Sequence, residues 1–88
     1  PIYDLTGIED FVALTYLNCS SNQLASLDIS NNVALEYLEC QDNQLANLDL
    51  SNNLALTYLD CQQNQLTSLD VSNSLALSRT KSNIKITQ

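Results

Sequence analysis

The chain has 88 residues and a hydrophobic content of 44%, which allow one folded domain and argue against disorder. Its ten acidic residues all precede its three basic ones, so residues 1–78 carry a formal charge of −10, against −7 for the whole chain. Such an acidic surface repels nucleic acid and anionic membranes. No apolar run reaches the roughly 18 residues that a membrane-spanning helix needs. The chain begins at Pro1 rather than Met, so we expect a processed protein or a piece of a longer one.

Residues 1–13 precede a repetitive region and match it only loosely. Leu5, Ile8 and Phe11 are spaced three apart, and Ile8 lies 21 residues before Ile29, which holds a regular position in the first repeat. We therefore expect a divergent half-coil that acts as an N-terminal cap. The bulky ring of Phe11 is expected to cover the open end of the first repeat.

Residues 14–76 consist of three 21-residue units, 14–34, 35–55 and 56–76, with the shared frame L-x-Y-L-x-C-x-x-N-Q-L-x-x-L-D-x-S-N-x-x-A. A fixed period of roughly 20–29 residues is the signature of a solenoid of stacked coils. Each half of a unit alternates apolar and polar residues before a polar turn, which predicts one short strand per half, on opposite sides of the coil. No segment has a sustained 3.6-residue apolar stripe, so very little helix is expected.

The alternation also predicts which side chains point into the coil. These inward positions are Leu14, Leu17, Cys19, Leu24, Leu27 and Ile29 in the first unit, Leu35, Leu38, Cys40, Leu45, Leu48 and Leu50 in the second, and Leu56, Leu59, Cys61, Leu66, Leu69 and Val71 in the third. The three cysteines are expected to be small buried thiols. Aligned side chains in neighbouring parallel strands point the same way, which is poor geometry for a disulfide, and a straight column does not converge on zinc.

The segment L-x-x-L-x-C-x-x-N-x-L, at residues 14–24, 35–45 and 56–66, resembles the conserved part of leucine-rich repeats. The nested second half, L-x-x-L-D-x-S-N, resembles a short class found in secreted and surface proteins of Bacteroidetes-type bacteria. The resemblance implies a leucine-rich repeat β-solenoid with parallel short strands on two faces. It also implies a recognition surface on the first strand face.

Polar residues that recur at the turns have a structural interpretation. Asn22, Asn43 and Asn64 follow the first strand and are expected to bond backbone groups and tolerate tight turn angles in place of glycine. Asn32 and Asn53 are expected to do the same after the second strand, and Ser74 replaces the third copy.

Outward positions of the first strand form the candidate binding site. The period aligns Tyr16, Tyr37 and Tyr58 in one column, Asn18, Glu39 and Asp60 in the next, and Gln41 and Gln62 in a third. Tyrosine is enriched in binding hot spots, so the columns predict a surface for a protein or a carbohydrate. The alternative is that the rings only stabilise the sheet by stacking.

A further column, Asp28, Asp49 and Asp70, lies on the second strand. Hydrogen bonds from the backbone or from the following serines would make these carboxylates capping groups. Cation binding is the alternative, although the later glycine and bidentate acid of a calcium loop are missing.

Residues 77–88 depart from the repeat, and we expect a cap strand or a junction there. The interpretation that keeps the core apolar inserts a four-residue turn, aligns Ile84 with Leu59 and Ile86 with Cys61, and places Lys85 beside Asp60. Straight continuation would instead put Thr80 and Ser82 in core positions and Lys81 beside Asp60. A weakly capped end also allows a homodimer through this edge.

These observations predict a noncatalytic interaction module of a secreted or cell-surface bacterial protein, with a structural spacer as the alternative. The chain has no histidine, and straight columns of like residues build no acid–base pair, so no enzyme activity, catalytic residue, metal site or cofactor is expected. Protein or carbohydrate is the expected partner, without nucleic acid or membrane insertion.

Overall fold

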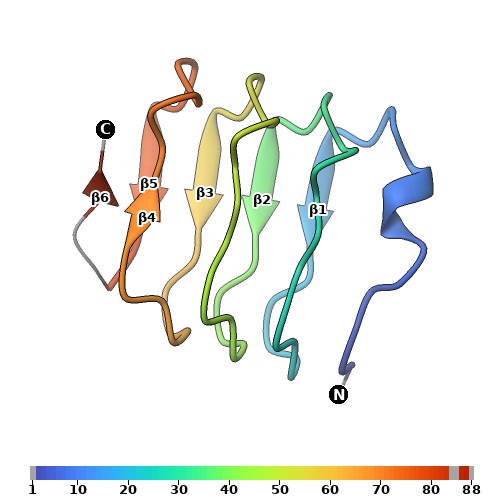
Figure 1. Ribbon diagram of the computed structural model, residues 1–88, viewed down its shortest axis with the longest axis vertical. Coiled ribbons are helices and arrows are strands. Elements are labelled where there is room, and N and C mark those ends of the chain that lie inside the picture. The colour runs from blue at the N-terminus through green and yellow to red at the C-terminus, as the bar shows by residue number, and fades with distance from the viewer. Residues whose placement is uncertain (1, 84–85, 88) are drawn as a thin grey trace.

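The computed structural model describes residues 2–83 and 86–87 and shows a flat stack of coils (Figure 1). Four three-residue strands form a parallel sheet along one side: β1 (Tyr16–Asn18), β2 (Tyr37–Glu39), β3 (Tyr58–Asp60) and β5 (Arg79–Lys81), in that order. Each strand pairs with the strand one coil on, at an offset of 21 residues. The period read from the sequence is therefore the register of the sheet.

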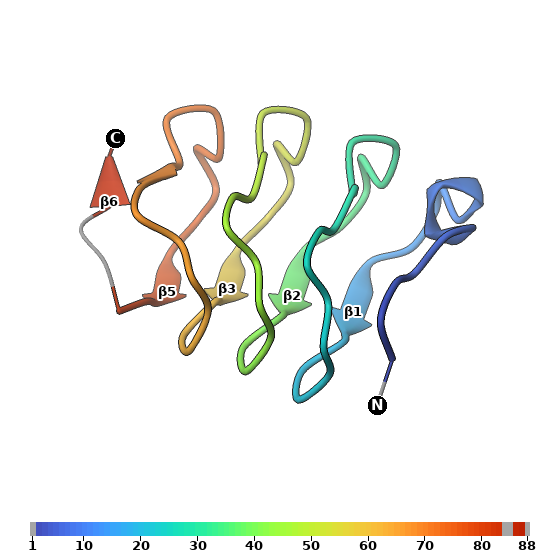
Figure 2. The same cartoon turned by 60° about the horizontal axis from the view of Figure 1, so that its bottom comes forward.

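The second half of each coil returns along the opposite side (Figure 2). Strand pairing there is sparse in the described part of the chain, where β4 (Leu69–Asp70) pairs with β6 (Ile86–Thr87) in parallel. One 3-10 helix, η1 (Ile8–Asp10), precedes the first coil. None of the described helices could cross a membrane. The prediction of a solenoid with parallel short strands and very little helix is confirmed, and its second face is the less regular one.

Leucine columns fill the space between the two sides of each coil. In the middle coil Leu35, Leu38, Cys40 and Leu45 are fully buried, and the predicted inward set is buried throughout the second and third units. In the first coil Leu14 and Leu17 are only half-buried, because they lie near the end of the stack. Each coil thus shields the apolar side of the next, as the repeat requires.

Asparagines after the first strand tie each coil to its neighbour. The Nδ2 group of Asn43 donates to the carbonyl oxygens of Cys19 (3.0 Å), Cys40 (3.1 Å) and Gln41 (3.3 Å), and its Oδ1 accepts from the N–H of Leu24 (3.0 Å). Asn64 repeats this set one coil later. The predicted backbone bonding by this column is confirmed.

The left-handed turn that these asparagines close is formed by the residue before each of them. Ser21, Asp42 and Gln63 have φ values of 57°, 59° and 54°. The expectation that Asn itself would adopt the tight turn angles was wrong. The amide instead bonds carbonyl oxygens just before the turn in its own coil and backbone groups of the preceding coil, which holds an unfavourable conformation of its neighbour in place.

The asparagine column of the second half lies beneath the opposite turns. The Nδ2 group of Asn53 donates to the carbonyl oxygens of Ile29 and Asn32, both at 3.1 Å. Asn32 donates likewise to Ile8 and Phe11. In the third unit the Ser74 hydroxyl donates only to the Asn53 carbonyl oxygen, at 3.4 Å. The turn with serine is therefore the more weakly bonded one, as the sequence indicates.

Replacement Ser74→Asn should stabilise the protein. By analogy with Asn53, the new amide would reach the carbonyl oxygens of Leu50 and Asn53. Its Oδ1 would stay unpaired, as the Oδ1 atoms of Asn32 and Asn53 are, so we expect a gain of about 0.5–1 kcal/mol. In a domain of this size that corresponds to a rise in melting temperature of roughly 4 °C. Thermal unfolding followed by circular dichroism measures it. An unchanged or lower melting temperature would show that a second hydrogen bond does not stabilise the third turn.

The two ends differ from expectation. Phe11 is 59% exposed and does not cover the first coil; Leu5 packs against the core instead. At the other end Thr80 pairs with Leu59 and Lys81 with Asp60. The favoured register for residues 77–88 was therefore wrong.

The straight register prevails because the backbone ladder continues into β5, where the N–H of Cys61 donates to the carbonyl oxygen of Lys81 at 2.9 Å. Ile86, expected beside Cys61, pairs with Leu69 on the opposite side of the coil. Ile84 and Lys85, the other residues of the expected cap strand, lie outside the described residues.

Candidate functional site

Three tyrosine rings stack along the outer face of the sheet. The ring centroids of Tyr16 and Tyr37 are 4.6 Å apart, and those of Tyr37 and Tyr58 are 4.3 Å apart, with interplanar angles of 16° and 17°. The row continues into β5, where the guanidinium carbon of Arg79 lies 5.3 Å from the centroid of the Tyr58 ring. A cation over the face of an aromatic ring is favourable. Arg79 was not among the predicted site residues, although it lies one period after Tyr58 and the count of 21 would have found it.

A row of acids and amides lies beside the rings, with its members bonded to one another. The hydroxyl of Tyr16 donates to Oε2 of Glu39 at 2.8 Å, across one coil. Because this hydrogen bond requires the protonated phenol, it raises the pKa of Tyr16. The amide of Gln62 donates to Oδ1 of Asp60 at 3.1 Å, and the amide of Gln41 lies 3.5 Å from Glu39.

The remaining member of this row, Asn18, bonds within its own coil. Its Oδ1 accepts from both the N–H and the hydroxyl of Ser20. The structure thus brings all eight predicted site residues onto one face, which we call the tyrosine face. Its members are Tyr16, Tyr37, Tyr58, Asn18, Glu39, Asp60, Gln41 and Gln62.

Exposure falls steadily along the tyrosine face. Tyr16 is 53% exposed and Tyr37 is half-buried, whereas Tyr58 and Asp60 are only 8% and 6% exposed. The last ring is covered because it lies between Tyr37 and Arg79. The rings and the polar strand residues nearest the N-terminus are therefore the most accessible to a ligand.

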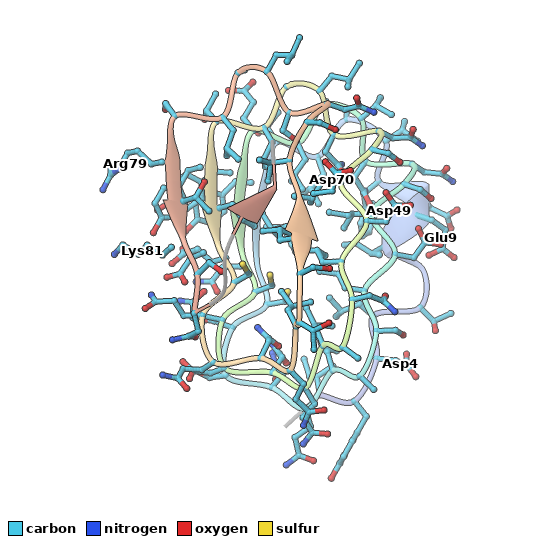
Figure 3. All side chains as sticks on the ribbon, turned by 60° about the vertical axis from the view of Figure 1, so that its left-hand side comes forward. Asp4, Glu9, Asp49, Asp70, Arg79 and Lys81 are labelled. Atoms are coloured by element: carbon cyan, nitrogen blue, oxygen red, sulfur yellow. The ribbon has the colours of Figure 1, made fainter. Side chains whose placement is uncertain are left out.

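The described basic residues lie on the sheet side of the stack, whereas acids lie on both sides, with Glu39 and Asp60 beside the rings. Figure 3 shows Arg79 and Lys81 projecting from the sheet side, while Asp49 and Asp70 project from the opposite side. Lys81 lies in register with Asp60. The two described basic side chains thus border the tyrosine face at its C-terminal end.

The cysteine column is buried and reduced. Cys19, Cys40 and Cys61 are free thiols with exposed fractions of 4% or less. Burial raises the pKa of the Cys19 thiol to about 11 and raises that of the other two as well. Because the thiolate is the reactive form, these cysteines act as apolar packing groups rather than nucleophiles.

The aspartate column on the opposite side consists of turn caps. Oδ1 of Asp28 accepts from both the N–H (3.0 Å) and the hydroxyl (2.6 Å) of Ser30, and Asp49 and Asp70 accept from the N–H of the serine two residues on. Hydrogen bonds from the serine hydroxyl and then its N–H lower the pKa of all three carboxyls, and for Asp49 this outweighs repulsion by its neighbours. The predicted capping bonds are confirmed.

These lowered pKa values predict acid sensitivity. A carboxyl that titrates lower in the folded chain than in the unfolded one stabilises the fold above its ordinary pKa of 3.8, and this stabilisation is lost as the pH falls through the folded value. We expect a melting temperature that is level from neutral pH to about pH 5 and falls below about pH 4. Carbon-detected NMR titration of the carboxyls checks the cause. In Ser51→Ala the pKa of Asp49 should return toward 3.8 while that of Asp28 stays low; an unshifted Asp49 would contradict the assignment.

The coil geometry, the leucine columns and the asparagine bonds define a leucine-rich-repeat solenoid. A solved structure similar to this chain is the functional domain of InlJ from Listeria monocytogenes, with 32% sequence identity and a TM-score of 0.86. The similarity covers 90% of this chain and 18% of that chain. That domain is described as including a cysteine ladder. No family model and no curated protein matches the chain. The similarity supports the repeat fold and does not extend to the Bacteroidetes-type class.

Proposed function

We propose that the chain is a noncatalytic recognition module that binds a protein or a glycan through the N-terminal part of the tyrosine face. The observation that carries the proposal is the continuous row of stacked rings that ends in the half-exposed ring of Tyr16. Stacking fixes the rings before a ligand arrives, which lowers the entropy cost of binding. Glu39 and Gln41 supply hydrogen-bonding groups beside the rings. A mixed apolar and polar patch on a protein would fit this combination, and so would a sugar.

The resemblance of the repeat to secreted and surface leucine-rich repeats supports an extracellular, bacterial location as part of the same proposal. The columns bring like side chains together, and the chain has no histidine, so we propose no enzymatic role and no cofactor. A homodimer through the β5 edge is a separate proposal, and sedimentation equilibrium tests it.

A structural spacer is the second candidate function, and one observation favours it. The polar groups of the tyrosine face already bond to one another, as Tyr16 does to Glu39 and Gln62 does to Asp60. A face whose groups are satisfied can stabilise the stack without any ligand.

The variant Tyr37→Ala separates the two functions. The ligand is first sought with a glycan array and a pull-down from bacterial and host surface extracts, and the affinity of the purified ligand is then measured for both chains. Recognition predicts a loss of affinity of at least roughly tenfold with a nearly unchanged melting temperature. A spacer predicts a lower melting temperature and no specific ligand. Thr67→Ala, on an exposed side chain outside the face, is the matched control.

A further inference from the structure

A second column of side chains, outside the tyrosine face, is apolar and exposed. Val12, Val33, Leu54 and Leu75 are spaced 21 residues apart, and their exposed fractions are 59%, 55%, 61% and 90%. An alanine follows each of them, at positions 13, 34, 55 and 76. We call these eight residues the apolar ridge. Isolated exposed aliphatic residues are ordinary, whereas a contiguous row of them marks an interaction surface.

The ridge follows the turns that lead from the back of each coil into the next strand. These turns line up at the top of the stack in Figure 1, at the end of the sheet where the parallel strands begin. Neighbouring coils of a parallel sheet are about 4.8 Å apart, so four ridge side chains span roughly 14 Å. A hollow lined by Val71, Leu75, Leu77 and Thr80, among others, adjoins the most exposed member.

The fold itself does not require apolar residues at these positions. The turns are held by the buried Asn32, Asn53 and Ser74, whose side chains bond to backbone carbonyls. The leucine columns fill the core without any contribution from the ridge. A polar residue at positions 12, 33, 54 and 75 would serve the turn equally well and would favour solubility.

The negative charge around the ridge indicates which kind of partner would bind there. Residues 1–78 contain ten acids and no base. Two of these acids, Asp10 and Glu36, are exposed in the segments that flank the ridge in sequence. A second copy of this chain docked ridge to ridge would bring two acidic segments together, which opposes self-association through this surface.

We propose that the apolar ridge is a docking surface for a protein segment that presents a row of aliphatic or aromatic side chains flanked by lysine or arginine. An amphipathic helix has this form, because its apolar side chains recur along one face at a spacing close to that of the coils. The ridge lies outside the tyrosine face, so the proposal stands independently of the proposed function.

The test uses three synthetic peptides of about 14 residues, which as helices span about 21 Å. The first has leucines on one helical face and lysines on the other, the second has glutamates in place of the lysines, and the third has serines in place of the leucines. Binding to the ¹⁵N-labelled chain is followed by NMR, and affinity by fluorescence polarisation. We expect the Leu/Lys peptide to shift amides of residues 12–13, 33–34, 54–55 and 75–76, and to bind more tightly than the other two.

The double variant Leu54→Ser/Leu75→Ser should bind the Leu/Lys peptide at least roughly tenfold more weakly. Its melting temperature should be unchanged, because both side chains are exposed. Tyr37→Ala should bind it normally, which separates the ridge from the tyrosine face. Shifts centred on Tyr16 and Tyr37, or equal affinity for the double variant, would overturn the proposal. So would concentration-dependent ridge shifts without peptide, since these would identify a second copy as the occupant.

Discussion

Replacement Asn43→Asp should unfold the protein near neutral pH or lower its stability by about 3–5 kcal/mol, the range found when a buried charge loses its partner. The new carboxylate keeps the acceptor that binds the Leu24 N–H. Its second oxygen, however, replaces the Nδ2 group of Asn43. That group now donates to the carbonyl oxygens of Cys19, Cys40 and Gln41, and an oxygen there would face them without a proton to donate. Three hydrogen bonds are lost and a charge is buried at a position only 8% exposed.

The same variant should behave unusually with pH. Burial beside carbonyl oxygens raises the pKa of a carboxyl, because the protonated form can still donate one hydrogen bond. A carboxyl with a raised folded pKa destabilises the fold when ionised, so the melting temperature of Asn43→Asp should rise on acidification from pH 7 to 5, where the parent chain stays level.

Asn52→Asp is the matched control, since Asn52 is exposed and its amide makes one bond, to the carbonyl oxygen of Ser30. It should lose less than about 1 kcal/mol. Equal losses at the two positions, measured by urea unfolding, would show that the buried amide is not what joins the coils.

Replacement Leu38→Ala should have the second largest effect. The side chain is fully buried in the middle coil, between its register partners Leu17 and Leu59. Truncation removes apolar contact area and leaves a cavity that the coils above and below cannot close, so we expect a loss of about 3–5 kcal/mol. Small domains have a total stability of about 5–15 kcal/mol, so the variant should be partly unfolded at room temperature.

Leu17→Ala supplies the comparison for Leu38→Ala. Leu17 belongs to the same column but is half-buried beside the N-terminal cap. Its truncation leaves space that water or the cap can fill, and we expect about half the loss. Unfolding in urea measures both variants. A larger loss at Leu17 would show that the cap, rather than the middle coil, holds the stack together.

The regular part of this fold could be predicted because one number, the period of 21, determines it. Once Cys19, Cys40 and Cys61 are aligned, the leucine columns of residues 14–76 and the repeated bonds of Asn43 and Asn64 follow from position. The left-handed turn could not be found in this way. Ser21, Asp42 and Gln63 are all polar but differ in size and charge, and the asparagine after each of them is the more suggestive residue.

The end of the chain was mispredicted because apolar character was given more weight than backbone pairing. Placing Ile84 beside Leu59 kept the core apolar, yet Thr80 takes that position. At the last strand of a stack the side chain is only half-buried, so a threonine costs little, whereas the continuing ladder to β3 and the contact of Arg79 with Tyr58 both favour the straight register.

The residues of the candidate site could be predicted from the sequence, but how exposed each of them is could not. Alignment of Tyr16, Tyr37 and Tyr58 follows from the repeat, and their stacking follows from the spacing of parallel strands. The burial of Tyr58 and Asp60 depends on the strand that carries Arg79 and Lys81. The leucine and cysteine pattern is lost in that segment, so only the count of 21, and no apolar motif, places Arg79 and Lys81 beside Tyr58 and Asp60.

The asparagine bonds that join the middle coils reach no further than the adjacent coil, since Asn43 and Asn64 each bond the coil before their own. Opening one coil therefore breaks bonds with two neighbours in the interior and with one at either end. Amide hydrogens should exchange with solvent in order of distance from the ends: slowest at Leu38 and Cys40, faster at Leu17 and fastest in β5. Such a gradient would describe the chain as a short zipper whose opening begins at its termini, rather than as a unit that opens all at once.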